Sequence, residues 1–467
     1  GPSPLMARPR RLSPASPRVR LADRERPFVS SWGPFPPRAL LSYVDSGSDV
    51  PLLPTGFPAK PPSLGLRPRL GWPPGGRARY VPDATASTLR HITTGNSHED
   101  NVSSRNARAL PRPARLPAAA EKFVVGFQPY DTISYQAIVN AELGLWKKYT
   151  HAGTEIEFQP ALQGTVVANN MLANKAQVGY MSVMPATILC SKPKQAEIKM
   201  VAALGMSKGT RCSLIVVRKD APEFKGNEEV ARWLDGKIIA APKGSASDQY
   251  LRRFFEKYNV KPGEYLNQSI EVIATNFRIG KIDAASLWEP TLSRIATDVG
   301  EGTARIVADG SACDNPDLGI LNMRADFVKN HRDVAKGYLR AELEAQRYML
   351  DPANWENVIN MVSKYATGIP KNVLWYSIYG LVPSDGTDPV REWKNFYFGD
   401  RERANIVEVA PFLFKSKIIS MEKLPEGIVD DSLAREVFKE AGYAPVSPDA
   451  ALGVIKGAKA ADCPFKN

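Results

Sequence analysis

The sequence predicts an α/β protein with two lobes, each built on its own sheet. Short apolar runs typical of buried strands alternate with amphipathic stretches typical of helices from Lys122 onward. The alternation repeats, which favours β-α-β units and largely parallel sheets. The strands are too numerous for one six-stranded sheet. We therefore expect the chain to enter the second lobe near 212–220 and to return near 319–327, so that two crossing strands form a hinge.

The first lobe opens with KFVVGFQP, a short apolar run that is ended by proline and reads as a strand. The next stretch, 133–149, is amphipathic, because Ile133, Ile138 and Trp146 fall roughly on one side of a helix. The same reasoning then predicts, in order, a strand at 154–161, a helix at 164–176 and strands at 177–183 and 198–206.

The second lobe is expected to begin with the strand CSLIVVRKD. The helix predicted at 245–260 starts with small hydroxylated residues suited to an N-cap. The other elements expected here are a helix at 227–235 and strands at 236–244, 269–275, 284–290 and 304–310. After them we predict a return strand at 319–327, a long helix at 331–350 and further helices up to the C-terminus.

Charge divides the chain into two unlike parts. Residues 1–120 hold 18 Lys+Arg and 7 Asp+Glu, a net charge of +11, and 21 of the 39 prolines. The remaining residues hold 43 basic and 42 acidic side chains, a net charge of +1. The basic character therefore belongs to the leader and not to the α/β body.

The leader, 1–120, shows no sustained helical or strand period and is expected to be disordered. One interpretation is an RNA-binding or targeting arm. The favoured interpretation is a mis-assigned start or a fused upstream reading frame. LPAAA, which ends at Ala120, resembles a signal-peptide cleavage site, but no apolar segment of the usual length precedes it.

The sequence offers little sign of a metal site or a membrane span. No run of 18 or more apolar residues occurs. The four histidines are scattered, and the cysteines have no zinc-like spacing, so we predict no metal and no cofactor. One or two disulfides are allowed, but their pairing stays open among Cys190, Cys212, Cys313 and Cys463.

Four segments in order carry a resemblance to a known family. They are 159–188 (QPALQGTVVANNMLANKAQVGYMSVMPATI), 236–264, 281–295 (KIDAASLWEPTLSRI) and 319–355. Together they resemble the periplasmic substrate-binding proteins of ABC importers for nitrate, aliphatic sulfonates, taurine and thiamine precursors. The likeness runs roughly over 122–380, with a looser helical continuation to about 445.

The resemblance implies a type II periplasmic-binding-protein fold, with two Rossmann-like lobes joined by a two-strand hinge. They would close on a small solute and present it to a permease in the inner membrane. It also implies a periplasmic monomer. The expected boundaries are a first lobe at 121–211 and 318–445, a second lobe at 212–317 and a tail at 446–467.

Candidate ligand contacts follow from the rule that solutes bind at the carboxyl ends of strands and at helix N-termini. In each case an ordinary turn, cap or core role is the alternative. The residues singled out in the first lobe are Gln128, Tyr130, Asp131, Gln163, Gly164, Thr165 and Ser182. Those in the second lobe are Ser245, Ser247, Trp288 and Glu289.

The two carboxylates among these candidates bear on the class of solute. Asp131 and Glu289 would come from opposite lobes. If both face the cleft, a purely anionic ligand such as nitrate is repelled, and an amine, a zwitterion such as taurine or a donor-rich heterocycle fits better.

Three function classes compete. The first is a non-catalytic solute receptor, and the second is a thiamine-pyrimidine-synthase-like enzyme on the same scaffold. Such an enzyme is expected to carry a cysteine-rich motif and a functional histidine, which this sequence does not show in a cleft segment. The third, a nucleic-acid binder acting through the leader, ranks last. The sequence therefore favours the receptor, with no nucleic-acid partner.

Overall fold

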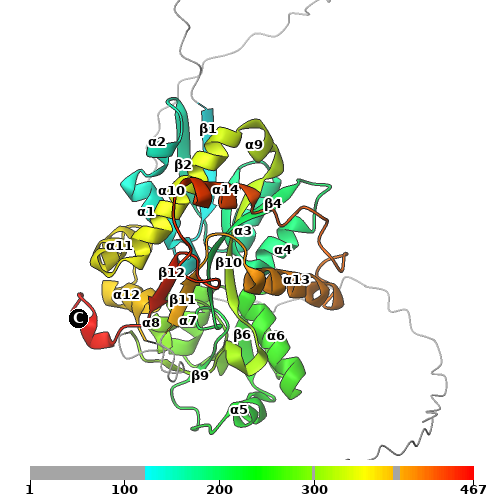
Figure 1. Ribbon diagram of the computed structural model, residues 1–467. Helices are drawn as coiled ribbons and strands as arrows, with labels where there is room; N and C mark the ends of the chain where they lie inside the picture. Colours follow the sequence, from blue (N-terminus) through cyan, green and yellow to red (C-terminus); the bar gives the residue numbers. More distant parts are fainter. Residues whose placement is uncertain (1–120, 297–299, 382–389, 467) are drawn as a thin grey trace, which may run out of the picture. The chain divides into compact units, whose positions relative to one another are not determined.

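The computed structural model describes residues 121–296, 300–381 and 390–466 (Figure 1). The leader predicted at 1–120 lies outside the described residues. The described strands form two separate sheets, one of seven strands and one of five. The prediction of an α/β fold with two sheets is therefore confirmed.

The seven-stranded sheet combines strands from both ends of the described chain, in the order β12-β11-β4-β10-β3-β1-β2. Its strands are β1 (Glu121–Phe127), β2 (Thr154–Pro160), β3 (Val178–Ser182), β4 (Ile198–Ser207), β10 (Asp317–Arg324), β11 (Val390–Lys394) and β12 (Gly453–Lys456). The segment expected as a tail, 446–467, thus contributes an edge strand.

The five-stranded sheet has the order β7-β6-β8-β5-β9. Its strands are β5 (Ile215–Arg218), β6 (Ile238–Ala241), β7 (Glu264–Asn267), β8 (Ala284–Ala285) and β9 (Ala304–Ala308). The strand predicted at 284–290 shrinks to the two residues of β8, because the chain turns at Glu289 and Pro290 and a helix begins at Thr291.

Helices fill the connections between the strands of both sheets. Those of the first half are α1 (Tyr135–Leu143), α2 (Trp146–Tyr149), α3 (Gly164–Leu172), α4 (Val183–Cys190), α5 (Asn227–Leu234), α6 (Ala246–Tyr258) and α7 (Ile270–Arg278). Those of the second half are α8 (Thr291–Ala296), α9 (Ala325–Asn330), α10 (Arg332–Leu350), α11 (Trp355–Val362), α12 (Lys371–Tyr379), α13 (Asp400–Lys415) and α14 (Ser432–Glu440).

Two sequence predictions of secondary structure are wrong. The apolar run at 269–275 was expected as a strand, but it forms α7, whose buried residues Ile270, Ile273, Ala274 and Phe277 recur at helical spacing. The region after α10 was expected to be helical, but it also supplies β11 and β12. Strand β11 (VREWK) is rich in charged residues and β12 (GVIK) has only four residues, so neither shows an apolar alternation in the sequence.

The expectation of largely parallel sheets is also wrong. Strand β1 runs parallel to β2 and β3, and β6 runs parallel to β7 and β8. The remaining named pairs are antiparallel, including β10 with both β3 and β4. One reason is that a strand that crosses over from the other sheet runs in the opposite direction to its new neighbours. Strand β10 does so between β3 and β4, and β5 does so between β8 and β9.

Two connecting segments, 208–214 and 309–316, join the sheets. The Asp317 carboxylate anchors the first of them, because it accepts hydrogen bonds from the amides of Arg211 at 2.8 Å and Cys212 at 2.9 Å. The segments touch at glycines, since a Cβ on Gly209 would lie 2.5 Å from the Cα of Gly310. Close backbone approach of this kind requires residues without a side chain.

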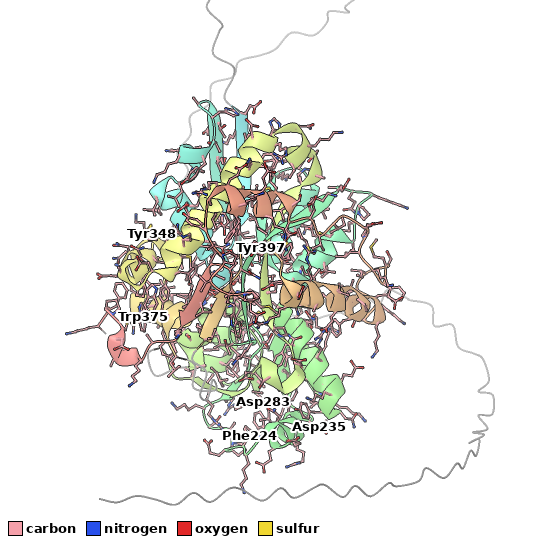
Figure 2. All side chains as sticks on the ribbon, in the orientation of Figure 1. Phe224, Asp235, Asp283, Tyr348, Trp375 and Tyr397 are labelled. Atoms are coloured by element: carbon pink, nitrogen blue, oxygen red, sulfur yellow. The ribbon has the colours of Figure 1, made fainter. Side chains whose placement is uncertain are left out.

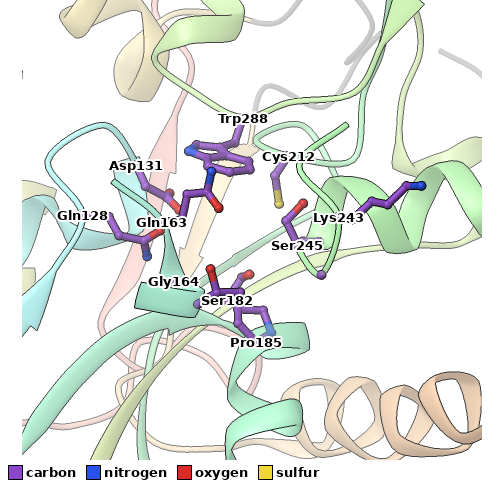
Figure 3. A pocket seen from close by; sticks show the side chains of 13 residues that line it. Gln128, Asp131, Gln163, Gly164, Ser182, Pro185, Cys212, Lys243, Ser245 and Trp288 are labelled. Carbon is purple, nitrogen blue, oxygen red and sulfur yellow. The ribbon is translucent and has the colours of Figure 1, made fainter. Parts of the chain in front are cut away.

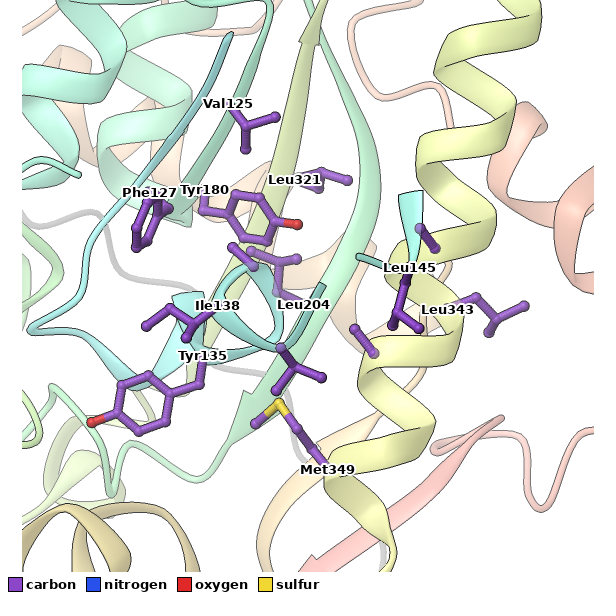
Figure 4. Packing of buried hydrophobic residues seen from close by; sticks show 14 of the residues in the cluster. Val125, Phe127, Tyr135, Ile138, Leu145, Tyr180, Leu204, Leu321, Leu343 and Met349 are labelled. Atoms are coloured by element: carbon purple, nitrogen blue, oxygen red, sulfur yellow. The ribbon is translucent and has the colours of Figure 1, made fainter. Parts of the chain in front are cut away.

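The largest apolar core lies between the seven-stranded sheet and α1, α10 and α11 (Figure 4). Val125 and Tyr180 project into it from the strands, and the Tyr180 hydroxyl donates to Glu342 of α10 at 2.5 Å. Trp375 of α12, labelled in Figure 2, is 1% exposed and belongs to this core. It packs near Tyr379, as aromatic core residues commonly do.

Candidate functional site

A pocket with about 380 Å³ of empty space lies where elements of the two sheets face each other (Figure 3). The lining comes from the ends of β1 and β3, from the starts of α3, α4 and α6, from the first connecting segment and from the loop after β8. The lining residues are Gln128, Asp131, Gln163, Gly164, Thr165, Ser182, Pro185, Cys212, Lys243, Gly244, Ser245, Ala246 and Trp288.

Two helix N-termini open into this pocket. Helix α3 begins at Gly164 and α6 begins at Ala246, and both of these residues line the space. The first turn of a helix leaves amide groups without intrahelical acceptors, and the helix dipole makes that end attractive to anions. The pocket therefore has the features of an oxyanion site.

Small residues let the two helix starts approach each other. A Cβ on Gly164 would lie 3.2 Å from Pro185 Cγ, so a side chain at this position would crowd the pocket wall. Gly244 has φ +84°, and a Cβ there would lie 3.8 Å from Thr165 Cγ2 at the opposite helix start. A left-handed φ favours glycine.

The polar side chains of the pocket differ in how many of their hydrogen-bonding groups already have partners within the protein. The Ser245 hydroxyl donates to the Pro242 carbonyl at 2.6 Å and accepts from the Asp248 amide at 3.3 Å, so it serves as an N-cap. The Gln128 side chain donates to the Tyr180 carbonyl at 3.2 Å, which leaves its amide oxygen for other donors. Ser182 ends β3 at the pocket wall.

Asp131 is the acidic group of the pocket. Its carboxylate accepts from the Ile133 amide at 3.1 Å and caps the short helix that precedes α1. Burial raises the pKa of Asp131 to about 7, and the Ile133 hydrogen bond and the Arg211 charge oppose that shift. The side chain is therefore poised between the neutral and charged forms near neutral pH.

Trp288 supplies a flat wall that is tied to the other side of the pocket. Its side chain is largely buried, and its indole nitrogen donates to the Tyr130 carbonyl at 2.9 Å. Trp288 follows β8 and Tyr130 follows β1, so this hydrogen bond crosses from one sheet to the other. Figure 3 shows the ring at one end of the space that Asp131 also borders.

Eight of the eleven residues predicted from the sequence line the pocket, and three do not. The Tyr130 hydroxyl instead lies 3.2 Å from Thr367 Oγ1, and Ser247 donates to the Cys212 carbonyl at 2.8 Å. Glu289 is buried against Arg391 at 2.9 Å and accepts from Ser293. Of the two carboxylates expected to face the cleft, Asp131 lines the pocket and Glu289 does not.

Sequence reasoning missed five lining residues, namely Pro185, Cys212, Lys243, Gly244 and Ala246. Three of these adjoin Ser245, and the strand-end rule applied to 236–244 could have included them. Lys243 borders the pocket through its backbone, because its ammonium group points away from the pocket (Figure 3). The ammonium nitrogen lies 4.9 Å from the centre of the Tyr265 ring. The Cys212 thiol donates to Asp317 at 2.9 Å, a pairing that no sequence signal indicates.

The cysteines are free thiols in this structure. All four cysteines fall in the described ranges, and none is in a disulfide. Within those ranges no group of three or more His, Cys, Asp and Glu side chains could hold a metal ion. Among the helices that the structure describes, none combines the length and apolarity that crossing a membrane needs.

Comparisons with known proteins point to one family. The model of the NMT1-like family matches residues 117–363, more than half of the 467 residues. The taurine-binding periplasmic protein of Escherichia coli (strain K12) is 24% identical over 229 residues, which are 47% of this chain and 66% of that protein. The nitrate/nitrite binding protein NrtA of Synechocystis is 24% identical over 243 residues, 49% of this chain and 53% of that protein.

Both matches thus span less than two thirds of the relative's own length. Among solved structures, the alkanesulfonate-binding protein SsuA from Xanthomonas axonopodis pv. citri, bound to MOPS, is similar with a TM-score of 0.53 and 16% identity. The similarity covers 67% of this chain and 99% of that chain. At this identity the likeness shows the fold, which is that of type II periplasmic binding proteins, as the sequence resemblance implied.

Proposed function

Since the chain belongs to the NMT1-like family, we propose that it is a solute receptor of an ABC importer. The single observation that carries this proposal is the pocket in which two helix N-termini and Asp131 border one small space. The names of the curated relatives support it, because they are binding proteins for taurine and for nitrate and nitrite.

The solute is a small sulfonate with an amine, of the taurine class. The amides that begin α3 and α6 would hold the oxyanion, together with the Thr165 hydroxyl. Asp131 would accept the ammonium group, and Trp288 would cover the short carbon chain. A plain anion such as nitrate leaves Asp131 without a cationic partner.

The eight predicted residues that line the pocket are the proposed contacts, and Gly244 and Ala246 join them through their backbone. The two sheets with their helices act as lobes, the first formed by 121–211 and 318–445 and the second by 212–317. They would close about the connecting segments 208–214 and 309–316, which approach each other closely at Gly209 and Gly310.

The proposed setting is the periplasm, where a monomeric receptor would hand its solute to a permease in the inner membrane. The relatives named as periplasmic proteins support this setting. Thiols can be oxidised in that compartment, but Cys190 and Cys212 are both buried and therefore shielded from an oxidant in solution.

An enzyme of the thiamine-pyrimidine-synthase type is the weaker alternative. Cys212 is the cysteine that lines the pocket, and burial next to Asp317 raises the pKa of its thiol. A thiol in that state is a poor nucleophile, because the thiolate is the reactive form. The environment of Cys212 therefore favours a receptor.

Isothermal titration calorimetry on the full chain tests the proposal with four compounds: taurine, ethanesulfonate, ethylamine and nitrate. We expect taurine to bind most tightly and Asp131→Asn to reduce that preference over ethanesulfonate. Equal affinity for taurine and ethanesulfonate in the unaltered protein would contradict the role of Asp131. Heat from none of the four would contradict the solute class.

A further inference from the structure

Strand β11 carries three charged side chains into the interior. Arg391 and Glu392 are each 1% exposed, and Lys394 is fully buried. The family model ends at residue 363, so this strand lies beyond the matched region. Buried charges are strongly unfavourable unless they are paired and hydrogen-bonded, so their partners indicate what the strand does.

Arg391 connects three separate segments. Its guanidinium donates to the Ser377 carbonyl of α12 at 2.5 Å and to the Thr210 carbonyl of the first connecting segment at 3.0 Å. It also pairs with Glu289 at 2.9 Å, directly after the pocket residue Trp288. One side chain thus joins the seven-stranded part, the connection between the sheets and the base of the pocket wall.

Glu289 transmits this contact to the pocket. Its carboxylate accepts from the Ser293 amide at 2.9 Å and from the Ser293 hydroxyl at 2.8 Å, which fixes the start of α8. Its own amide donates to the Arg211 carbonyl at 3.0 Å. The backbone directly after Trp288 is therefore held by hydrogen bonds of Glu289, the residue with which Arg391 pairs.

Glu392 and Lys394 anchor the strand to the same junction. Glu392 accepts from the Arg211 side chain at 2.6 Å, and the Lys394 ammonium donates to the Leu204 carbonyl at 2.6 Å. Gly205 leaves the space that the Glu392 carboxylate occupies, because a Cβ at position 205 would lie 2.0 Å from that carboxylate. The strand is fitted into the junction rather than laid on its surface.

A second connection between the two parts is much more exposed. Lys415 of α13 pairs with Glu256 of α6, and their side chains are 73% and 60% exposed. Exposed pairs contribute little free energy, whereas removal of one partner from a buried pair has a large effect. The two contacts therefore allow a matched comparison.

We propose that Arg391 is a positioning residue of the binding site, and that the region after the family match acts through it. By holding Glu289, it fixes the position of the Trp288 wall relative to the seven-stranded sheet. Ligand affinity is then set partly by a strand that does not line the pocket. The predicted effect of Arg391 on ligand affinity rests on the proposed function. Its predicted effect on the backbone around Trp288 does not.

Hydrogen-exchange mass spectrometry on the full chain, with and without taurine, tests the positioning. In ligand-free Arg391→Lys we expect amides of 286–296 to exchange about ten-fold faster than in the unaltered protein, because the planar fork of arginine is lost. Core amides of β1 and β3 should exchange as before. The taurine Kd should rise by about ten-fold. Lys415→Gln should change neither quantity.

Glu289→Gln is the second variant and covers the case in which Arg391→Lys does not fold. It keeps the size of the side chain and an oxygen for Ser293, and we expect the same local increase in exchange. Unchanged exchange at 286–296 in this variant would overturn the proposal. A uniform increase across all peptides would also overturn it, since that outcome marks a general stabilising role. If taurine does not bind the unaltered protein, the exchange result still decides the positioning role.

Discussion

The Trp288 indole donates its N–H to the backbone carbonyl of Tyr130 at 2.9 Å, and the bond links the end of β1 to the end of β8. Tyr130 follows a strand of the seven-stranded sheet and Trp288 follows a strand of the five-stranded sheet, so the bond forms only while the ends of these two strands face each other. It leaves the indole face toward the pocket, where a ligand's carbon atoms would lie. One residue therefore both links the two sheets and supplies an apolar wall of the pocket.

Trp288→Phe separates these two contributions. Phenylalanine keeps an aromatic wall but lacks the indole donor, so we expect taurine to bind about five- to ten-fold more weakly, the value of one hydrogen bond. Isothermal titration calorimetry measures the change. The control is Trp233→Phe on α5, whose ring contacts Phe224 and is not among the residues that line the pocket. An equal loss in both variants would show that the effect is not local.

The pH dependence of binding distinguishes the two solute classes. Asp131, with its pKa near 7, is mostly neutral at low pH and mostly charged at high pH. Affinity for taurine should therefore rise by about ten-fold between about pH 6 and pH 8, and affinity for ethanesulfonate should fall. In Asp131→Asn both slopes should vanish. Parallel slopes for the two compounds would contradict an ammonium contact at Asp131.

The stability of the ligand-free protein should depend on the same group. The pKa of Asp131 is higher in the folded protein than its ordinary value of 3.8, so the folded state binds the proton more tightly and loses stability as pH rises from about 4 to about 7. Asp131→Asn should therefore raise the free energy of unfolding at pH 8, by at most about 4 kcal/mol, and have little effect near pH 4. Urea unfolding at both pH values measures it. The exposed Asp449→Asn serves as the control, and a gain that is the same at both pH values would refute the link.

Gly205→Ala tests how tightly β11 fits. The new Cβ would lie 2.0 Å from the Glu392 carboxylate, at a φ of +139° that already disfavours side chains. We expect destabilisation of about 3 kcal/mol beyond that of Gly236→Ala, because the buried Arg211–Glu392 pair must shift. Gly236 also has a positive φ, +73°, but a Cβ there would meet nothing within 4 Å. Equal thermal shifts in the two variants would show that the junction relaxes freely.

Local signals in the sequence identified most of the elements around the pocket. The strand that became β1 is a short apolar run closed by Pro129, and α6 begins where Ser245 can cap it. Because solutes meet the carboxyl ends of strands and the starts of helices, these local features were enough to predict Asp131, Gly164 and Trp288 as lining residues.

Other features depend on partners far away in the chain. The run at 269–275 has a composition that suits either a strand or a helix, and packing of Ile273 and Phe277 decides for α7. Strand β11 looks like a charged surface segment, because Arg391 and Glu392 meet their partners, Glu289 and Arg211, more than 100 residues earlier.

The alternation of strands and helices, the family and most of the residues that line the pocket could be predicted from the amino-acid order, since each depends on neighbours a few positions apart. The folded chain was needed to see that Glu289 pairs with Arg391 instead of facing a solute, and that Asp131 alone carries the pocket's acidic charge. Burial and ion pairing are set by groups brought together in space. A carboxylate's exposure and its pKa therefore cannot be read from its own position in the chain.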